Sequence, residues 1–233
     1  MCKFTIVIPV YNEAKNLKIL IPKIYRELKN QKFEIIVVDD NSTDMTSKIL
    51  EKFKKKNFHH IIRKNKRDLS KSCILGFKKS KYNNIIVMDG DLQHKPSDIK
   101  KFLHIFRKSS PDIIVGTRDL FKNKKHNLNV VRLFASRILI LIVKVLLGNK
   151  TSDPMSGFFM FKKRIFIKSQ KELVKKGYKI LLDLLYIKNQ KIKVIDVMIN
   201  FDTRMKGKSK MSAKVLFYLI SMILTKFVIK ILA

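Results

Sequence analysis

The stretch "IIVMDGDLQHKP", residues 85–96, joins a run of apolar residues to a cluster of polar ones. Its first residues carry no charge and suit a strand that is buried on both faces. Asp89 and Asp91 follow with Gly90 between them, and Gln93 and His94 come next. Because ligands bind at the carboxyl ends of strands in open parallel sheets, this stretch predicts both a parallel sheet and a site at its edge.

The rest of the first half repeats this rhythm of short apolar runs and amphipathic segments. Apolar runs that suit strands lie at residues 4–10, 33–38, 59–62, 84–88 and 112–115. Apolar stripes at helical spacing are formed by Leu17, Ile21, Ile24 and Leu28, by Met45, Ile49 and Phe53, and, after the candidate N-cap Ser97, by Ile99, Phe102, Leu103 and Phe106. Alternating strands and helices predict an α/β fold with a mostly parallel, Rossmann-like central sheet flanked by helices.

The second half is more apolar. Residues 130–147, "VVRLFASRILILIVKVLL", are apolar nearly all round. This suits a buried helix, a helix in contact with a membrane, or a helix that does both on different faces. A turn-like "NKTSDPMSGFF", a helical pattern near 173–187 and a strand at 193–201 follow. The uncharged run 215–225 is shorter than the about 20 residues that span a bilayer, so we expect an interfacial helix. Residues 1–210 are predicted to form the main domain, and 211–233 an apolar C-terminal helix at the membrane interface.

Composition narrows the class of partner. The 233 residues include 51 Lys and Arg but only 18 Asp and Glu, a net charge of +33. Nucleic acid, an anionic membrane surface or phosphorylated small molecules would each be attracted, although the scattered Lys also suits a compositional bias. The two cysteines, Cys2 and Cys73, support neither a disulfide framework nor a thiolate zinc site. The first apolar run lacks the features of a signal peptide, so we expect the protein on the cytoplasmic side.

Polar clusters follow four of the predicted strands: "PVYNE", "VDDNSTD", "MDGDLQH" and "GTRD". Their positions predict one shared site. Asp89 and Asp91 can face one hard cation because Gly90 permits a tight turn, and Gln93 adds a neutral oxygen. Mg²⁺ or Mn²⁺ with phosphate oxygens and water fits this ligand set, whereas a solvated surface turn is the alternative for an isolated Asp-x-Asp.

The chain contains neither a P-loop nor a Gly-x-Gly-x-x-Gly motif, so a bound nucleotide must be held by side chains. Asp39 and Asp40 could accept hydrogen bonds from a base or a ribose. The alternative for Asp40 is to cap a helix that starts near Ser42 or Asp44. His59, His60 and His94 lack a partner pattern, and we interpret them as structural.

Taken in order, "IPVYNE", "VVDDNSTD", "MDGDLQHKPSDI", "VGTRD", "DPMSGFF" and "RMKGKSK" resemble the motifs of dolichyl-phosphate or polyprenyl-phosphate mannosyltransferases, in the inverting GT-A family 2 of glycosyltransferases. The resemblance implies transfer of mannose from GDP-mannose to a polyprenyl phosphate, with a divalent cation, Mg²⁺ or Mn²⁺. It also implies a peripheral or monotopic enzyme on the cytoplasmic face of a membrane. A membrane-anchoring partner protein stays an open expectation, and nucleic acid is not an expected partner.

The resemblance also assigns individual residues. The nucleotide would be held by Pro9, Tyr11, Glu13, Val38 and Asp40. Asp89, Gly90, Asp91 and Gln93 match the metal and diphosphate motif, with Asp91 and Gln93 as the favoured direct ligands. Arg204 and Lys210 match the basic pair that closes over the donor diphosphate. Arg118, Arg132 and Ser136 resemble the group that receives the lipid phosphate.

Three positions depart from the motifs of this family. Gly90 stands where alanine is frequent, and Lys95 where a second proline is frequent. Asp68 replaces the glycine of a "GLS" helix start, which puts the turn beside the donor sugar in question.

The expected chemistry needs no His–carboxylate pair, because a phosphate acceptor is already anionic near neutral pH. The charge on the departing GDP would be offset by the metal, Arg204 and Lys210. A single in-line displacement would give a β-linked product. Two alternatives stay open: a transferase that uses UDP-glucose or another nucleotide sugar with undecaprenyl phosphate, and a basic nucleic-acid-binding module.

Overall fold

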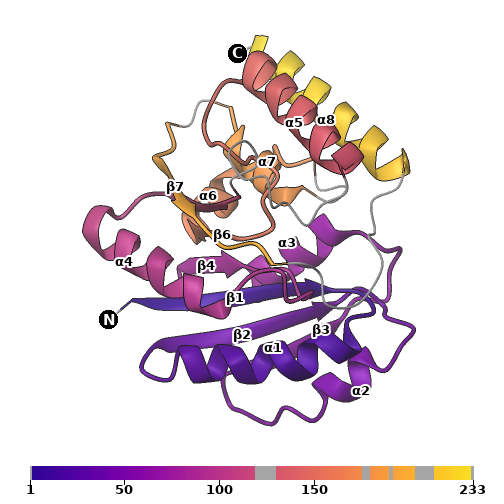
Figure 1. Ribbon diagram of the computed structural model, residues 1–233, viewed down its shortest axis with the longest axis vertical. Coiled ribbons are helices and arrows are strands. Elements are labelled where there is room, and N and C mark those ends of the chain that lie inside the picture. The colour runs from indigo at the N-terminus through magenta and orange to yellow at the C-terminus, as the bar shows by residue number, and fades with distance from the viewer. Residues whose placement is uncertain (1, 119–129, 175–178, 189–190, 203–212, 232–233) are drawn as a thin grey trace.

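The computed structural model describes residues 2–118, 130–174, 179–188, 191–202 and 213–231 (Figure 1). Its core is a seven-stranded sheet in the order β3-β2-β1-β4-β6-β5-β7. The strands are β1 (Lys3–Val10), β2 (Lys32–Asp39), β3 (Phe58–Ile62), β4 (Asn84–Val87), β5 (Ile113–Thr117), β6 (Phe159–Lys162) and β7 (Val194–Met198). β6 pairs antiparallel with β4 and β5, and the other pairs are parallel. The prediction of an α/β fold with a mostly parallel sheet is therefore confirmed.

The strand β6 is the main feature that the sequence prediction missed. It inserts between β4 and β5, directly after the turn-like residues 149–158. Its four residues, "FMFK", are too few to show an alternating pattern, so their apolar character alone did not distinguish a strand from a turn. Five of the other strands lie within two residues of the predicted ranges, and β7 ends three residues before the predicted end of the sixth.

Helices cover both faces of the sheet. They are α1 (Ala14–Glu27), α2 (Thr46–Leu50), α3 (Leu69–Lys79), α4 (Ile99–Ser109), α5 (Val130–Leu147), α6 (Lys163–Ser169), α7 (Ile180–Leu185) and α8 (Ala213–Ile231). Alternate residues of β1 divide the core, as expected for a buried strand. Ile6 and Ile8 join the apolar stripes of α1 and α4, while Val7 faces α3 and the cluster that includes α5 to α8.

Three helix predictions need correction. Ser97 does not cap α4, because a 3₁₀ turn at Pro96–Asp98 precedes that helix. The second helix is shorter than expected, and Met45 is exposed rather than buried. The pattern near 173–187 yields a helix only at α7, and α6 was not predicted. Each error lies at a helix end or in a short helix, where local turns compete with the periodic pattern.

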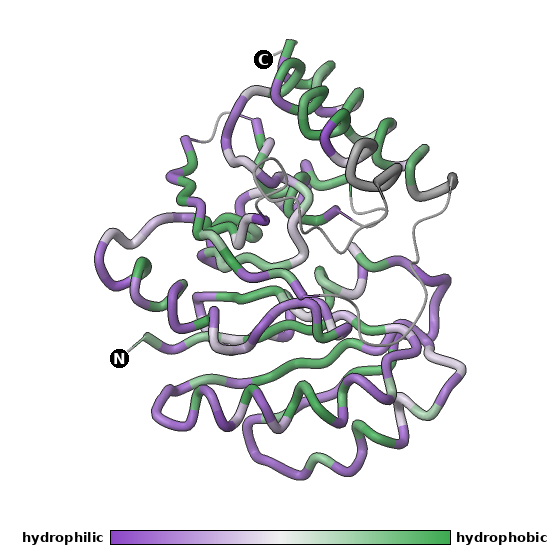
Figure 2. Tube along the Cα trace, viewed as in Figure 1, coloured by the Kyte–Doolittle hydropathy of each residue, from purple (hydrophilic) through white to green (hydrophobic). Residues whose placement is uncertain are grey.

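The helices α5 and α8 run side by side at the end of the molecule that carries the C-terminus (Figure 1). Both are predominantly hydrophobic (Figure 2). Leu139 and Val143 of α5 and Met222 of α8 are buried in the core, while large apolar side chains on the outer sides are exposed. Each of these two helices is therefore buried on one face and exposed on another. Among the described residues, no helix combines the length and the apolar character that a bilayer crossing requires.

Candidate functional site

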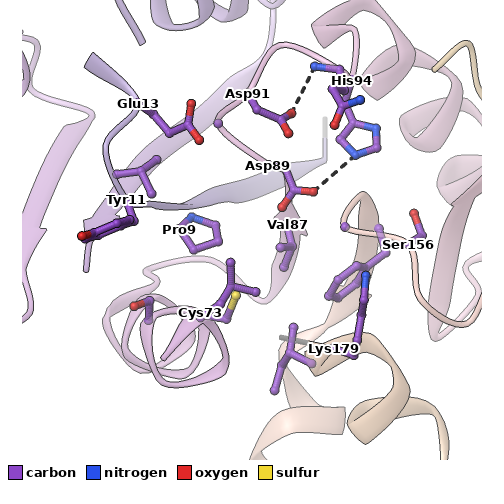
Figure 3. Close-up of a pocket in the computed structure, with 18 of the residues that line it drawn as sticks. Pro9, Tyr11, Glu13, Cys73, Val87, Asp89, Asp91, His94, Ser156 and Lys179 are labelled. Atoms are coloured by element: carbon purple, nitrogen blue, oxygen red, sulfur yellow. Dashed lines mark hydrogen bonds and ion pairs between the residues drawn. The ribbon is translucent and has the colours of Figure 1, made fainter. Parts of the chain in front are cut away.

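A pocket lies where the carboxyl ends of β1, β2, β4 and β5 meet. Its walls include nine of the predicted site residues: Pro9, Tyr11, Glu13, Asp40, Asp89, Gly90, Asp91, Gln93 and Arg118. Tyr11 and Glu13 lie on one side of the pocket and Ser156 and Lys179 on the other, with Asp89 between them (Figure 3). The prediction that the loops after these four strands share one site is thus supported by the geometry.

Left-handed residues shape three of these loops. Asn12 after β1, Asn41 after β2 and Leu92 after β4 have φ angles of 55°, 61° and 65°. Asparagine tolerates this conformation, whereas leucine adopts it rarely and at a cost of about 1–3 kcal/mol. The surrounding packing must hold Leu92 in place, and its side chain is buried in the core. The turn at Leu92 brings Gln93 back toward the two aspartates.

The two aspartates of the acidic motif differ in environment. The side chain of Asp89 is 37% exposed, while Asp91 is buried and its Oδ1 accepts a hydrogen bond from the Gln93 N–H at 3.2 Å (Figure 3). The Gln93 side-chain amide donates to the Asp202 carbonyl at 3.3 Å, which leaves its oxygen as the ligand-capable atom. The motif therefore offers two carboxylates and one amide oxygen to the same pocket.

His94, which we interpreted as structural, also lies beside Asp89 of the acidic motif. Its buried ring lies between Phe158 and Phe201, with ring centroids 5.0 and 5.2 Å away. Its Nε2 is 3.7 Å from Asp89 Oδ2. The ring thus packs as a structural residue does, and it also borders the carboxylate of the acidic motif.

The loops after β1 and β2 are fastened to each other. The Asn12 N–H donates to Ser42 Oγ at 2.8 Å, and the Thr43 N–H donates to Asn12 Oδ1 at 2.8 Å. Asp39 is fully buried, and its carboxylate accepts hydrogen bonds from Ser42 and Ser47. Val38 is also fully buried, within β2. Asp39 thus shapes the loop, and direct nucleotide contacts by Asp39 and Val38 stay predictions that this geometry does not favour.

Asp40 has a different arrangement, because it lines the pocket and organises the chain before α3. Its Oδ1 accepts from Arg63 Nε at 2.7 Å, and its Oδ2 accepts from the Asp68 N–H at 2.7 Å. Asp68 caps α3 by accepting from the Lys71 N–H at 3.1 Å. The φ of Asp68 is −164°, an extended conformation that any residue adopts, so the missing glycine does not disturb this turn.

Arg118 forms the basic side of the pocket. Its Nε and Nη2 donate to the two oxygens of Asp153 at 2.6 and 3.0 Å, a bidentate pair in which Asp153 is fully buried. Burial alone would lower the pKa of Arg118, but Asp153 and, less strongly, Asp89 raise it above its ordinary value. Arg118 therefore carries a fixed positive charge in the wall of the pocket.

Several residues that line the pocket were not predicted from the sequence: Arg67, Ser72, Cys73, Met155, Ser156, Gly157 and Lys179. Arg67 stacks over the Tyr11 ring at 4.1 Å from the centroid. Burial raises the pKa of the Cys73 thiol well above its ordinary value, as do Asp89, Asp68 and Asp40, so the thiol is not a nucleophile near neutral pH. The "DPMSGFF" motif was the signal that could have indicated Ser156 and Gly157.

Four predicted residues do not meet the others in the part of the chain that the structure describes. Arg204 and Lys210 lie outside the described residues, and so does the side chain of Arg132, whose backbone belongs to α5. Ser136 lies on α5, partly exposed, and does not line the pocket. The roles assigned to these residues by resemblance stay predictions.

The donor set fits a hard divalent cation. Asp89, Asp91 and Gln93 supply only oxygen ligands from one loop, which suits Mg²⁺ or Mn²⁺ and does not suit a thiolate metal. No group of three or more His, Cys, Asp or Glu side chains is gathered for a metal within the described residues. Mg²⁺ takes one or two carboxylates and completes its coordination with water and phosphate, so two aspartates suffice.

Comparison with known proteins identifies the class. The family model for glycosyl transferase family 2 matches residues 5–169, and the chain belongs to this family. Dolichol-phosphate mannosyltransferases from Pyrococcus furiosus and Mycosarcoma maydis are 35% and 29% identical to it, over 92% and 91% of this chain. The chain spans 61% of the length of the P. furiosus relative and 75% of the other.

The fold is similar to that of a solved glycosyltransferase. Glucosyl-3-phosphoglycerate synthase from Mycobacterium tuberculosis, in complex with Mn²⁺, uridine diphosphate and phosphoglyceric acid, superposes with a TM-score of 0.75. The match covers 97% of this chain and 78% of that one, at 15% sequence identity. At this identity the likeness supports the GT-A fold alone. The protein is thus a family 2 glycosyltransferase that resembles dolichol-phosphate mannosyltransferases.

Proposed function

We propose that the protein transfers mannose from GDP-mannose to the phosphate of a polyprenyl lipid at the cytoplasmic face of a membrane. The observation that carries this proposal is the presence of Asp89, Asp91 and Arg118 in a single pocket. The pocket offers oxygen ligands for a cation that binds a diphosphate, and it also offers a guanidinium for a second phosphate. The names of the P. furiosus and M. maydis relatives support mannose as the sugar and a dolichol-type phosphate as the acceptor.

The residues suggest how the reaction would proceed. Arg118 would orient the lipid phosphate, whose oxygen attacks C1 of mannose while the bond from C1 to the GDP oxygen breaks and its electron pair leaves with GDP. No proton has to be removed from an ionised phosphate, so the acceptor needs orientation rather than a strong base. A bound Mg²⁺ or Mn²⁺ would offset the charge that develops on the diphosphate. Arg204 and Lys210 are proposed to add to this from outside the described residues.

Transfer of radiolabelled mannose tests the proposal. Incubation of GDP-[¹⁴C]mannose with a short-chain polyprenyl phosphate and Mn²⁺ is expected to yield a β-linked lipid product, and omission of the lipid phosphate should abolish it. Parallel reactions with labelled UDP-glucose test the competing donor. Transfer from UDP-glucose but not from GDP-mannose would contradict the mannose assignment.

The outer side of α5 and α8 supports membrane attachment. It exposes Ile138, Leu141, Ile142 and Val145 of α5 and Leu216, Phe217, Ile220, Leu224, Val228 and Ile231 of α8, which together we name the α5–α8 apolar face. An apolar surface of this extent on adjacent helices marks an interaction site more often than a solvated one. Lys144 and Lys230 lie on the same two helices and could reach lipid head groups. We propose that this face lies in the membrane interface.

Charged substitutions on this face should release the protein from membranes. The triple variant Leu141→Glu, Val145→Glu and Phe217→Glu is expected to bind vesicles at least about 100-fold more weakly, because burial of each side chain contributes about 1.5–3 kcal/mol. Co-sedimentation with vesicles of phosphatidylcholine and phosphatidylglycerol measures the bound fraction.

The matched control places the same three charges elsewhere. Ile19, Met45 and Ile62 are exposed apolar residues of the N-terminal half, where α1 and α2 lie far from α5 and α8 (Figure 1). Their replacement by glutamate should leave vesicle binding within about twofold of wild type if short-range burial dominates. Equal losses in the two triple variants would show that net charge, not the α5–α8 apolar face, determines binding.

A further inference from the structure

The motif "DPMSGFF", residues 153–159, borders the pocket but has no assigned role in the chemistry above. It leads from the turn after α5 into β6 and reaches two charged groups from different loops. Its first residue, Asp153, holds Arg118, which follows β5. Its fifth residue, Gly157, adjoins Asp89, which follows β4. The segment therefore touches both the basic and the acidic sides of the pocket.

Gly157 has no side chain, and the Asp89 carboxylate lies in the space that this leaves. A Cβ atom at position 157 would lie 2.1 Å from Asp89 Oδ2 and 2.7 Å from Asp89 Cγ, far inside contact distance. The Asp89 carboxylate thus occupies the space that any other residue at 157 would fill. Glycine is needed here because of this close approach to its backbone.

The segment is fixed to the sheet on both sides. Ser156 Oγ donates to the Gly116 carbonyl at 2.7 Å, and the Gly116 N–H donates to the Phe158 carbonyl at 2.9 Å. Upstream, Asp196 of β7 accepts hydrogen bonds from Thr151 and from the Ser152 N–H. Because the segment is tied to β5 and β7, it can hold Asp153 and Gly157 at defined positions.

Arg118 and Asp89 are also each other's potential partners. Both line the pocket, and the negative charge of Asp89 contributes to the raised pKa of Arg118. A direct ion pair between them would neutralise a carboxylate of the acidic motif and turn the guanidinium away from an acceptor phosphate. Asp153 instead engages two N–H groups of Arg118 in a buried, bidentate pair, which fixes the plane of the guanidinium.

We propose that residues 153–159 keep the positive and negative groups of the pocket apart, which we call charge sorting. Asp153 holds Arg118 where it can bind the acceptor phosphate, and Gly157 leaves room for the Asp89 carboxylate to face a cation. Asp153 and Gly157 are thus positioning residues, which act through Arg118 and Asp89. This inference rests on the proposed function for the identity of the acceptor, but its metal-binding consequence can be measured without any sugar.

The role of Gly157 is tested with Gly157→Ala and Mn²⁺ alone. The added methyl group should displace the Asp89 carboxylate and weaken Mn²⁺ binding by about tenfold or more, the range found when the support of a metal ligand is removed. Electron paramagnetic resonance of free Mn²⁺ gives the affinity, and circular dichroism melting checks that the fold is retained. Wild-type Mn²⁺ affinity in a folded Gly157→Ala variant would overturn this part of the proposal.

The role of Asp153 is tested by a variant and its rescue. In Asp153→Asn, Arg118 should turn to Asp89, so Mn²⁺ affinity should fall by about tenfold. The KM for a short-chain polyprenyl phosphate should rise by roughly tenfold, the effect of one misplaced charge-assisted hydrogen bond. Adding Arg118→Gln removes the competing guanidinium, so the double variant should regain Mn²⁺ affinity while its KM for the acceptor stays high.

A purely structural role for Asp153 predicts the opposite, because a damaged fold would not regain metal binding on losing a second partner. A double variant that binds Mn²⁺ as weakly as Asp153→Asn therefore overturns the proposal, as would wild-type affinity in Asp153→Asn. Asp112→Asn is the matched control: it removes an Asp–Arg pair of 2.6 Å with Arg164 at the other end of β5. It should leave Mn²⁺ affinity unchanged.

The proposed function and the charge sorting by residues 153–159 can fail separately. If wild-type protein binds Mn²⁺ and the variants behave as expected, but no mannose is transferred, then the proposed function is wrong and the charge sorting stands. If mannose is transferred but Mn²⁺ affinity is insensitive to Gly157 and Asp153, then the charge sorting is wrong and the proposed function stands.

Discussion

Asp91→Asn is expected to lower mannosyl transfer by about 10³-fold, the scale of losing one principal electrostatic contact to the developing charge. Asp91 is buried in the pocket wall, where its Oδ1 accepts the Gln93 N–H. Asparagine keeps the shape and can still accept that hydrogen bond, so the fold of the loop should survive. What is lost is the negative charge that would help to hold the cation.

The measurement is the initial rate of transfer from GDP-mannose across a titration of Mn²⁺ and, separately, of Mg²⁺. Asp98→Asn is a matched control, because it makes the same chemical change further along the same chain segment, where Asp98 pairs with Lys101 at 2.6 Å. The control should keep wild-type rates at saturating metal. Equal transfer by wild type and Asp91→Asn would falsify the metal assignment.

A second large effect is expected on stability, at a buried ion pair between α7 and α8. Lys226 Nζ of α8 is 2.7 Å from Asp183 Oδ1 of α7, and both side chains are only 2% exposed. The same ammonium donates to the carbonyls of Glu172 and Asp183, each at 3.3 Å. Loss of either residue removes a charge partner 2.7 Å away from a buried group, so Lys226→Met or Asp183→Leu should each lower the free energy of unfolding by about 3–5 kcal/mol.

The double variant Lys226→Met with Asp183→Leu distinguishes loss of the ion pair from loss of side-chain packing as the cause of the lower stability. An apolar pair of similar volume is often as stable as a buried ion pair, so the double variant should recover most of the loss of either single one. Urea unfolding followed by circular dichroism gives these free energies. Lys230→Met on the exposed side of α8 should cost less than about 1 kcal/mol, and single variants at 226 and 183 with effects as small as this would contradict the prediction.

The parallel strands and their helices could be predicted because each carries its own pattern. Residues 35–38 are apolar on both faces of β2, and Leu17, Ile21 and Ile24 mark the buried side of α1. The rule that ligands bind at the carboxyl ends of parallel strands then predicts that Asp89, Asp91 and Arg118 lie together. Their shared pocket follows from topology, which is why the sequence was sufficient for it.

The remaining parts depend on contacts between distant segments, which have no local pattern. The four residues of β6 are a strand only because β4 and β5 flank them, and Gly157 matters only because Asp89 reaches it. The pairing of Arg118 with Asp153 joins residues 35 positions apart. Asp39 shows that an acidic residue beside a predicted site need not contact a ligand. Its carboxylate accepts hydrogen bonds from Ser42 and Ser47 and so shapes the loop.

The position of β6 also bears on the order in which the molecule assembles during synthesis. β4 pairs with β1, so the half of the sheet that β1 to β4 make can form once these four strands have left the ribosome, before β5 to β7 follow. β5, made earlier than β6, has no place at the growing edge until residues 159–162 have been made and inserted beside β4. Arg118 can therefore join the acidic motif only late, and we expect the nascent chain to assemble β1 to β4 before the part of the sheet that positions Arg118.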